Sequence, residues 1–149
     1  MNGTKVESFL DTNVLVYAYD SSEKDKHECA KRLLSEIYSK RRRVVLSTQT
    51  LSEFFTTVTK KIANPLPLEK AQGIIQDIVD FEQFRKVSIS PQTVLDAIEI
   101  QDISKTSYWD ALIAATMKEQ RVFEILTEDV EDFKKVQGII AKNPFSEKN

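Results

Sequence analysis

The chain has 149 residues, of which 41% are hydrophobic and 30% charged, and its formal net charge is −2. This length and composition predict a single globular domain, 1–149, with a buried core and a polar tail from about residue 146. The one cysteine, Cys29, excludes an internal disulfide, and the longest apolar run, 111–115, is far too short to cross a bilayer. We therefore expect no signal peptide, no membrane partner and a cytoplasmic location.

Short apolar runs predict strands, and apolar residues that recur every three or four positions predict helices. In chain order, we expect strand 5–10, helix 28–38, strand 44–46, helix 51–62, helix 68–84, strand 87–89, helix 91–103, helix 109–118, strand 123–126, helix 130–134 and strand 138–141. Pro65 ends helix 51–62, and Pro91 opens helix 91–103. Helix 109–118 is apolar nearly all round, so we expect it to be central and buried. Strands that alternate with helices favour right-handed crossovers and an α/β fold with a mainly parallel central sheet.

Four acidic residues, Asp11, Glu53, Asp110 and Asp129, stand where an apolar stretch meets the next helix. The carboxyl ends of parallel strands face one crevice, so acids at several of these ends can converge there. Converging carboxylates repel one another unless a cation compensates their charge, and oxygen ligands favour hard ions such as Mg2+ or Mn2+. The pattern therefore predicts a metal-dependent enzyme that acts on phosphates.

Each of these acids also has a purely structural explanation. Segments 50–53 and 107–110 match the helix capping box, and Asp11 and Asp129 could cap the turns or helices that follow them. The four acids nevertheless stand beside apolar neighbours that would draw them toward buried surroundings, where an unpaired carboxylate is costly. The two roles are compatible, since the positive end of a helix stabilises a carboxylate that also binds an ion.

Four short motifs occur in order along the chain: DTN at 11–13, STQ at 47–49 followed by Glu53, YWDA at 108–111 and LTED at 126–129. Together with their strand and helix contexts they resemble the PIN-domain nucleases, most closely the VapC-like toxins of type II toxin–antitoxin modules. The resemblance extends from the first strand to about residue 145. It implies an α/β/α sandwich with a central, mainly parallel sheet, an acidic pocket at one sheet edge, and Mg2+- or Mn2+-dependent cleavage of RNA.

The resemblance also implies which residues support the pocket and which partners the chain has. Asn13 and Thr127 match polar positions that support the acids, and Asp132 matches a further, less regular acidic position. The implied partners are an RNA substrate, a small antitoxin protein and a second copy of the chain in a homodimer.

The four acids match the four acidic positions of the family, and phosphodiester hydrolysis indicates a role for each. The reaction needs an activated water and charge relief on the phosphoryl and leaving oxygens, which one or two divalent cations supply. We predict that Asp11 and Asp110 hold the main cation. Glu53 would then orient or deprotonate the attacking water, and Asp129 would complete a second metal position.

Basic residues are candidates for contacts with RNA phosphates. The run Arg41, Arg42 and Arg43 is typical of a solvated loop, but it could bind substrate, as could Lys60 and Lys61. The only histidine lies in a charged stretch, so catalysis by histidine is not expected.

Two other functions remain open from the sequence. One is a phosphatase or phosphoacceptor domain that uses Asp11 as a nucleophile, although such families favour a second acid where this chain has Asn13, or a lysine where it has Thr127. The other is a non-catalytic scaffold that keeps the PIN-like fold and binds a partner. A scaffold has no need to maintain four mutually repelling carboxylates, so the nuclease is favoured.

Overall fold

The computed structural model describes residues 6–146, and within them all five strands form one sheet, in the order β3-β2-β1-β4-β5. Every pair of neighbouring strands is parallel. The strands are β1 (Ser8–Leu10), β2 (Val44–Ser47), β3 (Phe84–Val87), β4 (Glu124–Leu126) and β5 (Ile140–Lys142). The helices are α1 (Thr12–Tyr17), α2 (Lys24–Tyr38), α3 (Thr48–Lys60), α4 (Leu68–Asp80), α5 (Pro91–Ser104), α6 (Tyr108–Glu119) and α7 (Val130–Lys134). The predicted α/β fold with a parallel central sheet is confirmed.

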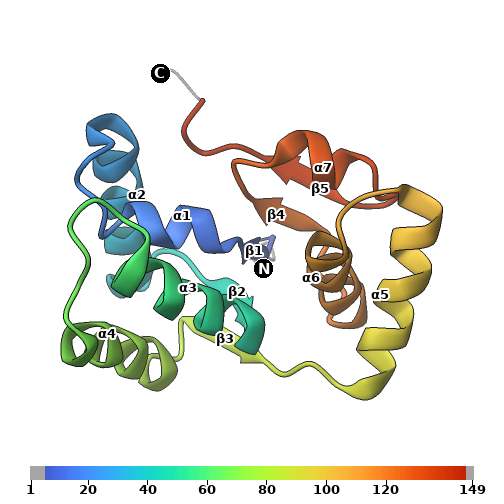
Figure 1. Ribbon diagram of the computed structural model, residues 1–149, viewed down its shortest axis with the longest axis horizontal. Coiled ribbons are helices and arrows are strands. Elements are labelled where there is room, and N and C mark those ends of the chain that lie inside the picture. The colour runs from blue at the N-terminus through green and yellow to red at the C-terminus, as the bar shows by residue number, and fades with distance from the viewer. Residues whose placement is uncertain (1–5, 147–149) are drawn as a thin grey trace.

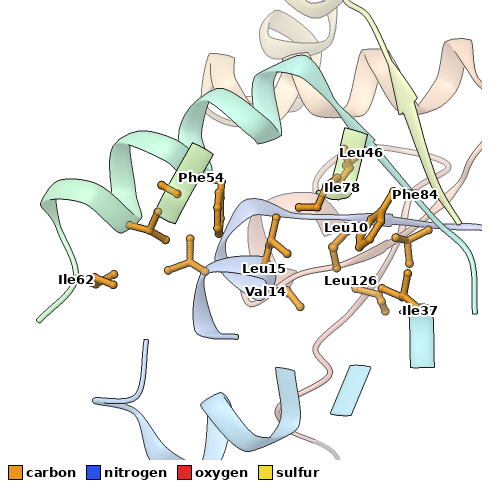
Figure 2. Packing of buried hydrophobic residues seen from close by; sticks show 14 residues of the cluster. Leu10, Val14, Leu15, Ile37, Leu46, Phe54, Ile62, Ile78, Phe84 and Leu126 are labelled. Atoms are coloured by element: carbon orange, nitrogen blue, oxygen red, sulfur yellow. The ribbon is translucent and has the colours of Figure 1, made fainter. Parts of the chain in front are cut away.

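Helices cover both faces of this sheet. Successive residues of a strand point to opposite faces, and apolar strand residues on each face pack against helices. Leu10, Leu46 and Leu126, from three neighbouring strands, pack against α1 to α4 in one buried cluster (Figure 2). Phe9 and Ile125 point to the other face and pack with residues of α6 and α7. Figure 1 shows α1 to α4 on one side of the sheet and α5 and α6 on the other. The molecule therefore has three layers, α/β/α.

The strand order creates a crevice at the carboxyl ends of β1 and β4. The chain passes from β1 to β2 and β3 on one side, and returns through α5 and α6 to β4 on the other side of β1. Ligands bind parallel sheets outside the strand ends at such a switch point. Asp11 directly follows β1, and its N–H donates to the Leu126 carbonyl at 3.0 Å, while Thr127 directly follows β4. Both residues therefore reach the crevice.

Helix α1 was not predicted, because its six residues are too few to show a helical repeat. Asp11 caps this helix by accepting a hydrogen bond from the Thr12 N–H. The prediction of strand 87–89 was wrong in position: the strand lies earlier in the chain. Strand β3 begins at Phe84, which pairs with Val44, so helix α4 ends at Asp80 rather than at residue 84. Strand β5 is likewise shifted from 138–141 to Ile140–Lys142.

The predicted capping boxes need one correction. Ser47, not Thr50, caps α3: its hydroxyl accepts from the Thr50 N–H, and its own N–H donates to the Thr50 side chain, in a full capping box. This places Glu53 in the second turn, away from the cap. Ser107 caps α6 as predicted and accepts a hydrogen bond from the Asp110 N–H at 3.2 Å.

Helix α6 is central and buried from residue 111 to residue 117, as predicted. Its first turn differs, because the Trp109 side chain is 60% exposed. Residue 5 of the first predicted strand and the predicted tail beyond Ser146 lie outside the described residues. From residue 6 to residue 146, no helix is both long enough and apolar enough to cross a membrane.

Candidate active site

One pocket of about 490 Å3 at the carboxyl edge of the sheet is lined by all four predicted acids. Asp11 comes from the end of β1, Glu53 from α3, Asp110 from the first turn of α6, and Asp129 from the loop after β4. Elements far apart in the sequence therefore bring four carboxylates to one place. Within 6–146, the structure thus shows the convergence that the strand-end positions predict.

Asp11 lies at the bottom of this site and is only 5% exposed. Its Oδ2 accepts a hydrogen bond from the Thr127 hydroxyl at 2.7 Å, and its Oδ1 accepts one from the Thr12 N–H at 2.8 Å. Burial raises the pKa of the Asp11 carboxyl to about 7, although these two hydrogen bonds oppose the rise. The negative charges of Asp129 and Asp110 add to it. Asp11 is therefore held in place, while among the described residues no positively charged side chain lowers its pKa.

Asp110 is half-buried, and its pKa is raised to about 6. Partial burial is the largest cause, followed by the charges of Asp129 and Asp132. The pKa of Asp129 is also raised, by partial burial and then by the charges of Asp132 and Glu128. The pocket is thus strongly negative, and binding of a cation would favour the ionised form of each acid.

Glu53 is oriented by two neutral donors. The Thr12 hydroxyl donates to its Oε1 at 2.8 Å, and the Gln49 Nε2 donates to its Oε2 at 3.1 Å. Gln49 lies one helical turn before Glu53 on α3, where residues four apart share a face. These contacts fix the carboxylate direction while leaving its charge uncompensated.

Asp129 is the most exposed of the four acids, and Asn13 connects it to the rest of the site. The Asn13 Nδ2 donates to Asp129 Oδ2 at 3.3 Å, and its Oδ1 accepts from the Glu128 N–H at 3.4 Å. The Thr127 hydroxyl oxygen accepts from the Asp129 N–H at 2.8 Å while its proton goes to Asp11. Asn13 and Thr127 therefore tie the loop after β4 to the Asp11 side of the pocket.

Asp132 does not line the pocket. Its carboxylate lies 3.6 Å from the Lys135 Nζ, although its charge still acts on Asp110 and Asp129. The structure places it beside the site rather than within it.

The basic residues singled out in the sequence are not all near the acids. Arg41, Arg42 and Arg43 precede β2 and so lie at the amino edge of the sheet, opposite the acid pocket. Arg42 and Arg43 form ion pairs with Glu36 and Glu7 there, at 3.4 and 3.6 Å. Lys61, by contrast, lines the acid pocket, and its neighbour Lys60 does not.

The donor set of the pocket fits a hard divalent cation, because it consists of carboxylate, amide and hydroxyl oxygens. Among the described residues, no group of three or more His, Cys, Asp or Glu side chains is placed so that it could hold a metal ion. Mg2+ does not require such a group, since it keeps several water ligands and takes one or two carboxylates from a protein. The residues that fit this role are Asp11 and Asp110, which carry the largest raised pKa values among the acids.

Three residues of this site were not predicted from the sequence, Thr12, Gln49 and Trp109, all of which line the pocket. The position of Gln49 four residues before Glu53 on one helix was a signal that could have identified it. Trp109 was assigned to a buried helix face on hydrophobicity alone, and only its place in the first turn of α6 exposes it.

Several solved structures share this fold. FitAcB from Neisseria gonorrhoeae matches with a TM-score of 0.67 and 20% identity, over 95% of this chain and 99% of the other. VapBC2 from Rickettsia felis, bound to a DNA fragment from its promoter, matches with a TM-score of 0.65 and 18% identity, over 93% and 98%. VapC20 from Mycobacterium tuberculosis, described as a sarcin-ricin loop cleaving toxin, matches with a TM-score of 0.65 and 19% identity, over 81% and 88%. At these identities the likeness establishes the fold.

Comparison at the level of sequence gives the family. No curated protein sequence matches the chain significantly. The sequence profile of the PIN domain matches residues 8–139, which run from the first strand to the residue before β5 and include all four acids of the pocket. On that match, over most of its length, the chain belongs to the PIN domain family.

Proposed function

We propose that this protein is a metal-dependent endoribonuclease that hydrolyses RNA phosphodiester bonds. The observation that carries the proposal is the convergence of Asp11, Glu53, Asp110 and Asp129 on one pocket of a PIN domain. A pocket of carboxylates with raised pKa values is suited to Mg2+ or Mn2+, and a phosphodiester is the substrate that such an ion can polarise.

Asp11 and Asp110 are the residues that would hold the cation, with Asp129 contributing a second position. A bound divalent cation would lower the pKa of a water and relieve negative charge on the phosphate. Glu53 would orient the attacking water and accept its proton, because Thr12 and Gln49 already fix the direction of its carboxylate. Asn13 and Thr127 would keep Asp129 and Asp11 in position.

A phosphoenzyme mechanism on Asp11 is less compatible with this geometry. Both oxygens of its carboxylate already accept hydrogen bonds, from Thr12 and Thr127, and the residue is 5% exposed. In-line attack on phosphorus needs an exposed oxygen, and Asp11 is buried. Each of its oxygens keeps a lone pair beside the hydrogen bond that it accepts, so the carboxylate can still bind a cation in the pocket.

The proposed biological role is the toxin of a toxin–antitoxin pair. Three observations on similar structures support it: VapC20 is described as a toxin, a Klebsiella pneumoniae structure as a toxin–antitoxin complex, and FitAcB and VapBC2 share the fold. We propose a small antitoxin as partner, and a homodimer as the assembly. The exposed apolar side chains of α5, Leu95, Ile98 and Ile103, are suited to an interface between subunits.

The proposal is tested by incubating total RNA with the purified protein in a series of Mg2+ and Mn2+ concentrations. Cleavage is expected with either ion and is expected to stop on chelation. Asp110→Asn should cut at a rate at least a hundredfold lower while its circular dichroism spectrum stays that of the wild type. Cleavage by that variant at the wild-type rate would exclude the proposed site.

A further inference from the structure

A second hollow, of about 480 Å3, adjoins the acid pocket. Gln49, Glu53 and Trp109 line both hollows, so the two share a wall. The remaining walls of the second hollow come from the apolar side chains of Ile89 and Leu112 and from the small polar residues Thr48 and Ser52. It is thus an apolar recess that opens beside four carboxylates.

Trp109 stands at the junction of the two hollows with an exposed indole. Its side chain is 60% exposed, although its helix is otherwise buried from residue 111 to residue 117. A large aromatic ring left in solvent next to a polar pocket is a surface on which a flat ring can stack.

Gln49 offers an unused acceptor at the same junction. Its side chain is only 9% exposed, and its Nε2 donates to Glu53 Oε2 at 3.1 Å and to the Trp109 carbonyl at 3.3 Å. Because both of these partners are acceptors, they require the NH2 group on their side and fix the orientation of the amide. The Oε1 atom is left buried without a hydrogen-bond partner among the described residues. Buried acceptors are nearly always satisfied, so this one needs a donor that the described residues do not supply.

We propose that the recess beside the acid pocket is a nucleobase subsite, in which a base stacks on the Trp109 indole and donates an N–H to the Gln49 Oε1. This assignment rests on the proposed function, because the acid pocket would bind the phosphate of the same nucleotide. The occupant follows from the wall that the two hollows share: the flat, largely apolar group next to an RNA phosphate is a base, and base edges carry N–H donors. The subsite would select the nucleotide next to the cleaved bond.

The test uses the fluorescence of Trp109, which is the only tryptophan of the chain. The probe is an adenine hexanucleotide with methylphosphonate linkages, whose uncharged backbone is neither cleaved nor repelled by the acids. We expect this probe to quench the fluorescence in the absence of metal, and an abasic oligonucleotide of the same length and linkage to leave it unchanged.

Affinity is then measured by the anisotropy of a labelled probe. Trp109→Ala is expected to weaken binding roughly tenfold or more, and Trp109→Phe to retain part of it. Phe123→Ala removes another exposed aromatic side chain, outside both hollows, and should bind as the wild type does. Replacing adenine by purine, which lacks the amino group, should weaken binding several-fold if that group donates to Gln49.

The outcomes separate this subsite from the nuclease proposal. If the protein cleaves RNA but binds base-containing and abasic probes equally, the subsite is excluded and the nuclease proposal is unaffected. Base-dependent quenching in a protein that cuts no RNA would support the subsite and contradict the nuclease. Equal affinity for adenine and purine probes would overturn the role of Gln49. Equal binding by Trp109→Ala would overturn the stacking, and the recess would then suit an apolar side chain of a protein partner.

Discussion

The Thr127 hydroxyl donates a 2.7 Å hydrogen bond to the Asp11 carboxylate, and its oxygen accepts one from the Asp129 N–H at 2.8 Å. One buried side chain therefore connects two acids that lie 118 positions apart in the numbering of the chain. This contact joins the carboxyl ends of β1 and β4, which are neighbours in the sheet. The geometry of the site depends on it.

Thr127→Val is expected to lower the free energy of unfolding by about 1–3 kcal/mol, because it leaves a buried carboxylate oxygen without its donor. It should also raise the pKa of Asp11 further, since that hydrogen bond lowers it. Urea denaturation at pH 8 measures the first effect. Thr127→Ser, which keeps the hydroxyl, should recover most of the loss, and a Val variant as stable as the wild type would contradict the role of the contact.

The metal-free protein is expected to lose stability as the pH rises. The pKa of Asp11 is about 7 in the folded protein against an ordinary value of 3.8, so the folded state holds a proton that the unfolded state releases. The resulting stability is complete below about pH 4 and is lost as the pH rises to about 7, at a cost on the order of 4 kcal/mol. Denaturation in EDTA at pH 5 and pH 8 measures it. Asp11→Asn should show a flatter pH dependence, and identical curves for the two proteins would contradict the shift.

Lys61→Gln is expected to weaken RNA binding, because Lys61 is the lysine that lines the acid pocket. Losing one phosphate contact should reduce the slope of log affinity against log salt concentration by about 0.7 for a single strand. Filter binding of RNA at several salt concentrations measures this slope. Lys60→Gln is the matched control, since Lys60 is exposed and lies outside the pocket. An equal loss from both variants would indicate a general effect of charge.

Glu53→Gln is expected to reduce kcat by about a hundredfold or more while leaving RNA affinity near that of the wild type. Glutamine keeps the size of the side chain but cannot take a proton from the attacking water. Single-turnover cleavage and RNA binding, measured side by side, separate the two quantities. Glu69→Gln, an exposed acid on α4, should leave both unchanged. A Glu53→Gln variant that binds RNA poorly but cuts normally would assign Glu53 to binding instead.

The layer architecture and the convergence of the acids followed from the sequence, because both depend on patterns that it displays directly. Apolar strands that alternate with amphipathic helices imply a parallel sheet, and strand-end positions place Asp11 and Asp129 at one crevice. The six-residue helix α1 could not be predicted in this way, since it is shorter than two helical repeats. Its position matters, because it carries Thr12 and Asn13 into the site.

The surroundings of the acids depend on tertiary contacts that no local pattern encodes. The basic run at 41–43 is conspicuous in the sequence, yet the sheet places it at the edge opposite the pocket. Trp109 is apolar and adjoins a buried helix, yet it is exposed at the start of α6. The unpaired Oε1 of Gln49 becomes visible only once the Trp109 carbonyl and Glu53 are known to occupy its amide nitrogen.

Calorimetric titration of Mn2+ into the metal-free protein tests most directly whether the acids share a cation. We expect saturable binding to the wild type, and its loss in both Asp11→Asn and Asp110→Asn. Asp96→Asn, which alters a partly exposed acid on α5 outside the pocket, should bind as the wild type does. Absence of Mn2+ binding to the wild type, or equal binding by all four proteins, would contradict the account.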